Sequence, residues 1–121
     1  MGVQGLRVIL VEDEALLLLE MQDMLEDLGC VIVGTAGRLP EATALANTAD
    51  FDVALLDMNI QGQRIDPVAR IVKDRCLPII FVTGYGARTL PPGVAAPVID
   101  KPCSRDKLRA LLAALEDRRH G

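Results

Sequence analysis

Short apolar runs alternate along the chain with longer segments of helical periodicity. Continuous aliphatic and β-branched runs predict buried strands, and five of them lie at residues 7–11, 30–36, 53–56, 78–82 and 97–99. Between them, apolar residues three or four positions apart predict helices that begin at residues 15, 40, 66 and 104. Strands that are apolar throughout and alternate with helices predict a parallel sheet covered by helices on both faces.

Local signals predict where several of these helices begin and end. Gly29 is expected to end the helix over residues 15–28, because glycine favours the position after a helix C-terminus. Asp66 and Pro67 predict an N-cap and a first helical turn, and Ser104 is expected to cap the last helix.

The segment between the last two predicted strands departs from this alternation. Residues 84–96 contain the helix-breaking residues Gly86, Pro91, Pro92 and Gly93. Adjacent prolines remove backbone donors and, together with the glycines, prevent more than about one turn of helix. The fourth helix of the pattern is therefore predicted to be short or replaced by a loop.

Composition limits the kinds of protein that this chain can be. Its 121 residues, half of them hydrophobic, suit one domain with an aliphatic core, and we expect a single domain over residues 1–121 with its core at about 7–116 and no output domain. The net charge of −4 argues against a nucleic-acid-binding surface. The cysteines lack metal-binding spacing, and no signal peptide or membrane-length apolar run is apparent. A cytoplasmic location without membrane contact is expected.

Five polar residues stand at the carboxyl ends of predicted strands. Glu12 and Asp13 follow the first strand, Asp57 the third, Thr83 ends the fourth, and Lys101 follows the fifth. Ligands of an open parallel sheet bind outside this edge. Each residue alone could be a solvated charge, a turn former or a surface lysine. Their coincidence at one edge predicts a shared site.

The chemistry of this set suits a metal ion and a phosphoryl group. The carboxylates of Glu12, Asp13 and Asp57 would repel one another unless a cation lay among them. Hard oxygen ligands favour Mg²⁺, with Mn²⁺ as an alternative. The Lys101 ammonium and the Thr83 hydroxyl can contact phosphoryl oxygens, which provides the positioning and charge neutralisation that phosphoryl transfer requires.

Together, these motifs resemble the signature of two-component response-regulator receiver domains, and the resemblance covers almost the whole chain. It rests on Glu12-Asp13, Asp57, Thr83 and Lys101-Pro102 in this order and spacing. The resemblance implies a flavodoxin-like (CheY-like) fold with five parallel strands in the order 2-1-3-4-5. It also implies that Asp57 accepts a phosphoryl group from a sensor histidine kinase or a phosphotransfer protein.

The same resemblance implies a ligand set. Mg²⁺ would bind Asp13, Asp57 and the backbone carbonyl of Asn59, with Glu12 contacting it directly or through water. The peptide bond between Lys101 and the following proline would be cis.

Departures from the usual receiver pattern point to a subgroup. Val98 occupies the place of the usual aromatic residue on the fifth strand, and Gly84 follows Thr83 in place of alanine. The run FVTGY at residues 81–85 is similar to the FATGUY receivers, which often stand alone and pair with kinases of the HWE or HisKA2 type. Tyr85 is accordingly the candidate switch residue.

Alternatives to a stand-alone phosphorylation switch or phosphate sink remain open. A metal-dependent phosphatase of the haloacid dehalogenase kind would need D-x-D after the first strand, where this chain has Glu12-Asp13-Glu14. A pseudo-receiver would bind partners without phosphorylation, and a flavodoxin would need a Ser/Thr-rich phosphate loop. We expect a phosphoacceptor signalling protein rather than an enzyme, with an unknown downstream protein target.

Overall fold

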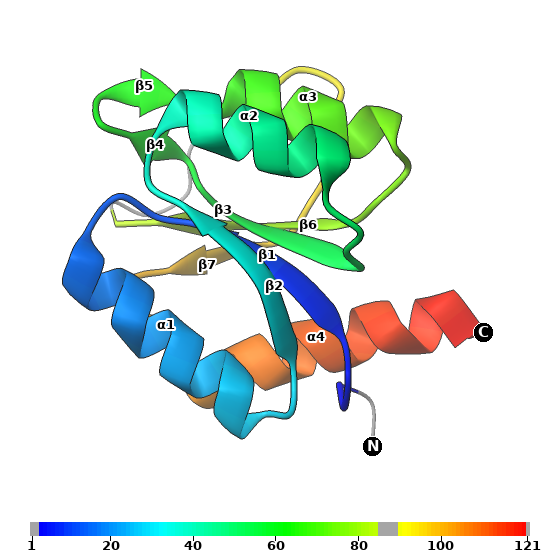
Figure 1. The fold of residues 1–121 in the computed structure, drawn as a ribbon. Helices are drawn as coiled ribbons and strands as arrows, with labels where there is room; N and C mark the ends of the chain where they lie inside the picture. The colour runs from blue at the N-terminus through cyan, green and yellow to red at the C-terminus, as the bar shows by residue number, and fades with distance from the viewer. Residues whose placement is uncertain (1–2, 85–89, 121) are drawn as a thin grey trace.

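The computed structural model describes residues 3–84 and 90–120 and has a five-stranded parallel sheet between two layers of helices (Figure 1). The strands lie in the order β2-β1-β3-β6-β7. Their bounds are β1 Arg7–Val11, β2 Val31–Ala36, β3 Val53–Asp57, β6 Ile79–Thr83 and β7 Val98–Asp100. This is the order 2-1-3-4-5 of the flavodoxin-like fold, so the prediction of fold and strand order is confirmed.

Two helices cover each face of the sheet (Figure 1). The bounds are α1 Ala15–Asp27 and α4 Arg105–His120 on one face, and α2 Leu39–Thr48 and α3 Asp66–Asp74 on the other. Successive strand residues point to opposite faces. Ile9 and Leu56 therefore pack with α2 and α3, whereas Leu10 and Leu55 pack with α1 and α4. The core is almost wholly aliphatic, as the composition indicates.

Gly29 ends α1 as predicted. Its φ of +93° is left-handed, and its N–H donates to Glu26 O at 3.0 Å while the N–H of Cys30 donates to Leu25 O at 3.0 Å. These paired bonds form a Schellman motif, which satisfies carbonyls that the helix leaves open.

Of the two predicted helix caps, one is confirmed and one is wrong. Ser104 Oγ accepts the N–H of Lys107 at 3.3 Å at the start of α4. Asp66 is not an N-cap, because α3 already begins at this residue and Ile65 occupies the cap position. The Asp66 carboxylate instead accepts a hydrogen bond from Arg64 Nε at 3.0 Å.

A short hairpin between β3 and α3 has no counterpart in the predicted elements. It consists of β4 Asn59–Ile60 and β5 Gln63–Arg64, which pair antiparallel. Strands of two residues are too short to show a hydrophobic period, so the apolar pattern does not reveal them.

Between β6 and β7, the described residues 84 and 90–97 contain no helix. Over this part of the segment the structure agrees with the predicted loop. The helices of the described ranges are also too short or too polar to traverse a bilayer.

Candidate functional site

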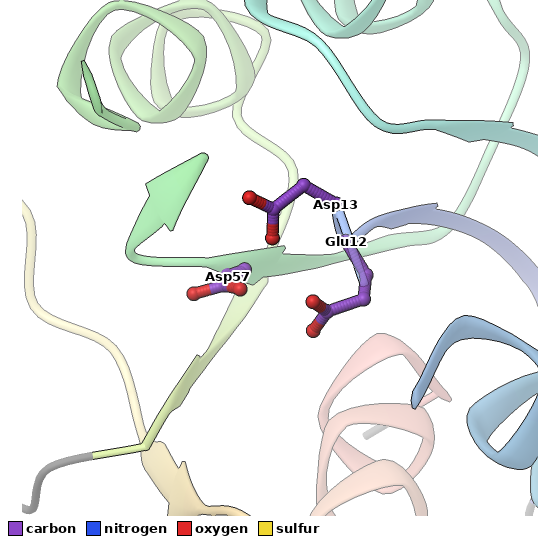
Figure 2. Close-up of side chains that lie close together, drawn as sticks. All are labelled: Glu12, Asp13 and Asp57. Atoms are coloured by element: carbon purple, nitrogen blue, oxygen red, sulfur yellow. The ribbon is translucent and has the colours of Figure 1, made fainter. Parts of the chain in front are cut away.

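Three carboxylates converge at the carboxyl ends of two adjacent strands of the sheet (Figure 2). Glu12 and Asp13 directly follow β1, and Asp57 is the last residue of the adjacent strand β3. One oxygen from each side chain lies within 4.8 Å of the others. Parallel pairing of β1 with β3 thus brings together acids that are far apart in the sequence.

Lys101 joins this cluster from β7. Its backbone N–H donates to Thr83 O at 2.8 Å, which holds the start of the following loop against β6. Its Nζ lies 2.8 Å from Asp57 Oδ2 and 2.9 Å from Glu12 Oε1. Burial lowers the pKa of Lys101, but the hydrogen bond to Asp57 and the ion pair with Glu12 outweigh burial and raise it above its ordinary value. The ammonium therefore remains charged at neutral pH.

Glu12 is the most buried acid of the cluster, with 1% of its surface exposed. Burial raises the pKa of Glu12, and the Glu14 N–H bond to Oε2 at 3.0 Å and the nearby Lys101 only partly offset that rise. Within the described ranges, buried Oε1 has no partner with hydrogen-bond geometry, although Lys101 Nζ lies close enough for an ion pair. A buried acceptor of this kind is costly unless a cation or donor satisfies it.

Backbone amides of the β4–β5 hairpin bind the other two carboxylates. The N–H of Gln61 donates to Asp13 Oδ2 at 2.8 Å. The N–H of Asn59 donates to Asp57 Oδ1 at 3.2 Å. The sequence does not reveal the contact of Gln61, because a backbone donor leaves no signal in the choice of side chain.

Most of the predicted residues line one cleft of about 600 Å³, although the buried Glu12 is not part of its wall. Its walls are formed by Asp13, Glu14, Leu17, Asp57, Asn59, Thr83, Gly84, Lys101 and Pro102. Thr83 is buried at the end of β6, and the Lys101–Pro102 bond is cis as expected. Tyr85, the candidate switch residue, lies outside the described residues.

The donor set fits a small hard cation. It combines three carboxylates whose oxygens are within reach of one ion, and the buried Glu12 Oε1 makes an ion pair with Lys101 but no hydrogen bond in the described part of the chain. Oxygen donors of this kind are those that Mg²⁺ and Mn²⁺ prefer.

Several known proteins and one family model are similar to this chain. The model of the response regulator receiver domain matches residues 8–113. The transcriptional regulatory protein PdtaR of Mycobacterium tuberculosis is 35% identical over 85 residues, which are 69% of this chain and 42% of PdtaR. The chain therefore spans less than half the length of this curated relative.

Solved structures match over nearly the whole chain. The solution structure of SdrG from Sphingomonas melonis Fr1 is 32% identical, with a TM-score of 0.79 and coverage of 95% of this chain and 98% of that one. The anti-anti-sigma factor PhyR from Bartonella quintana is 27% identical, with a TM-score of 0.82 and coverage of 96% and 49%.

Proposed function

Because this chain belongs to the response regulator receiver family, we propose that it accepts a phosphoryl group on Asp57 and thereby changes its contacts with other proteins. The observation that carries this proposal is the environment of the Asp57 carboxylate. It lines the cleft, contacts Lys101 Nζ at 2.8 Å and lies beside two further acids. A nucleophile, a fixed positive charge and a potential metal site are thus combined in one place.

The chemistry at Asp57 is a phosphoryl transfer between side chains. A carboxylate oxygen attacks the phosphorus of a phosphohistidine on the donor protein, and the donor's P–N bond breaks as the new P–O bond forms. The imidazole leaves and takes up a proton, and Asp57 becomes an aspartyl phosphate. Lys101 compensates the charge of the phosphoryl oxygens, and the Thr83 hydroxyl is proposed to donate to one of them.

The acidic cluster would hold the divalent ion. Asp13, Asp57 and the Asn59 carbonyl are proposed as ligands, with Glu12 bound directly or through water. When bound, Mg²⁺ or Mn²⁺ neutralises negative charge on the phosphoryl oxygens during transfer.

The partners are proposed to be proteins. The donor would be a sensor histidine kinase, of the HWE or HisKA2 type by the likeness of residues 81–85 to FATGUY receivers, or a phosphotransfer protein. The name of PhyR as an anti-anti-sigma factor supports a protein as the downstream target. We propose one receiver unit over residues 1–121, with its core at about 7–116.

A switch must link the aspartyl phosphate to such a target. We propose that Thr83 moves toward the phosphoryl group and that the segment after it, including Tyr85, rearranges. Val98 on β7 cannot supply the aromatic ring that receivers usually carry there, which favours Tyr85 for this role.

Incubation with acetyl phosphate, with and without Mg²⁺, tests the proposal by intact-mass spectrometry. A Mg²⁺-dependent gain of one phosphoryl group, without sustained turnover of p-nitrophenyl phosphate, is the expected result. Steady multi-turnover release from that ester would indicate a metal-dependent phosphatase. Lack of any uptake would indicate a pseudo-receiver.

A further inference from the structure

The β4–β5 hairpin contacts the acidic cluster through main-chain donors. Gln61 N–H reaches Asp13 Oδ2 at 2.8 Å across a sequence separation of 48 residues. Asn59, where the hairpin begins, donates its N–H to Asp57 Oδ1 at 3.2 Å. One small element therefore holds two of the three carboxylates.

The direction of the Gln61 amide is set by the turn. Gln61 has a φ of +52° and Gly62 a φ of +78°, and they connect the paired residues Ile60 and Gln63. Positive φ at both central residues defines a type I′ hairpin turn, which glycine adopts easily and glutamine adopts less commonly. The fully buried side chain of Ile60 anchors the base of the hairpin in the core.

Asp13 needs such a contact because its side chain is exposed. An exposed aspartate samples several rotamers, and fixing one of them costs conformational entropy. The hydrogen bond from Gln61 selects one rotamer before any ion arrives. A carboxylate has two oxygens, so it can accept this bond through Oδ2 and still ligate a cation.

We infer that the Gln61–Gly62 turn is a positioning element for Asp13 and sets the affinity of the acidic cluster for a divalent ion. The inference rests on the proposed function, in which Asp13 is a metal ligand. Groups that orient metal ligands typically change metal affinity by about 10-fold or more when they are lost. Reciprocally, binding of the ion should alter the environment of the turn.

Two glycine substitutions distinguish an effect on the position of Asp13 from a general loss of protein stability. Gly62→Ala introduces a Cβ at a φ of +78°, where an L side chain is strained although nothing lies within 4 Å. Gly5→Ala is a matched control, because Gly5 has the same φ and the same open space but lies in the turn before β1. Both variants should lose similar stability in urea unfolding.

Their Mg²⁺ affinities should differ. Isothermal titration calorimetry should give a dissociation constant roughly tenfold higher for Gly62→Ala and an unchanged constant for Gly5→Ala. Equal affinities of Gly62→Ala and Gly5→Ala would overturn the inference.

The amide resonance of Gln61 provides a readout that needs no folded glycine variant. In ¹⁵N-correlated NMR spectra of the parent, Mg²⁺ should shift Gln61 more than Gly5, and a Gln61 resonance insensitive to Mg²⁺ would overturn the inference. Asp13→Asn distinguishes the two levels of failure. Unchanged Mg²⁺ affinity in Asp13→Asn would refute the assignment of Asp13 as a ligand. If Asp13→Asn loses Mg²⁺ affinity while Gly62→Ala and Gly5→Ala bind Mg²⁺ equally well, only the positioning role of the turn is refuted.

Discussion

At the scale of residues, the site is a balance between one ammonium and several carboxylates. Lys101 Nζ contacts both Asp57 and Glu12, and the Lys101 side chain is only 14% exposed. Carboxylates held together with little solvent are favourable only while a cation stays near them. The lysine is therefore expected to stabilise the metal-free protein and to compete electrostatically with the ion.

Replacing Lys101 by methionine should test this balance. Lys101→Met keeps most of the side chain's length but leaves Glu12 and Asp57 without their ammonium. It should cost about 3 kcal/mol of unfolding free energy in metal-free buffer. Mg²⁺ should recover much of that loss and bind at least as tightly as in the parent. Urea unfolding with EDTA or with Mg²⁺ measures both effects. Lys107→Met, at an exposed position of α4, is the control, and an equal loss in the two variants would contradict the expectation.

Glu12 should make stability depend on pH. Burial raises its folded-state pKa above the ordinary value of 4.5, so the folded state favours the protonated acid. That contribution is fully present below pH 4.5 and is lost as the pH rises through the higher folded-state pKa. In metal-free buffer, Glu12→Gln should therefore gain stability relative to the parent as the pH rises above 4.5.

Urea unfolding across this range measures the gain. The exposed acid Glu20 of α1 supplies the control variant Glu20→Gln. Its difference in unfolding free energy from the parent is expected not to change with pH. A pH-independent difference for Glu12→Gln as well would mean that burial does not raise the pKa of the Glu12 carboxyl.

At the scale of elements, main-chain geometry supplies what side-chain patterns do not. The strands and long helices are predictable because many apolar residues repeat one period. The β4–β5 hairpin is not, since its turn depends on the φ angles of Gln61 and Gly62 and its strands have two residues each. The N-cap of α3 is also predicted wrongly, because the Asp66 carboxylate pairs with Arg64 instead of capping the helix.

The cap of α4 offers a test at this scale. Ser104 Oγ accepts the N–H of Lys107 at 3.3 Å, so Ser104→Ala should lose about 1 kcal/mol of unfolding free energy. Ser104→Asp retains an acceptor and should stay close to the parent in urea unfolding. An aspartate variant as unstable as the alanine variant would show that the cap contributes little.

The segment before β7 should respond to phosphorylation. Val94 N–H donates to Pro91 O at 3.1 Å, but residues 90–96 form no helix or strand. Their amides should exchange hydrogen faster than those of β6, and beryllofluoride with Mg²⁺ should change that exchange. Tyr85→Ala should blunt the change. Exchange rates in residues 90–96 that are identical in the two states would contradict a switch through this segment.

At the scale of the whole molecule, the alternation of strands and helices determines where chemistry can occur. The parallel order β2-β1-β3-β6-β7 brings the carboxyl ends of β1, β3, β6 and β7 to one edge of the sheet. Glu12, Asp57, Thr83 and Lys101 lie at this edge because they end or directly follow these strands. The position of these four residues at one edge was therefore predictable from the sequence. The pairing of Lys101 with Glu12 as well as Asp57 was not, because side-chain distances depend on packing and rotamers.

Site-specific phosphorylation is the most direct test of the proposed role of this edge. The parent protein and Asp57→Asn are incubated with acetyl phosphate and Mg²⁺, and intact-mass spectrometry with peptide mapping locates any phosphoryl group. The substituted amide keeps the shape of the side chain but lacks the nucleophilic carboxylate. We predict one Mg²⁺-dependent phosphoryl group on the parent, located at Asp57, and none on Asp57→Asn. Equal labelling of the two proteins would show that Asp57 is not the acceptor.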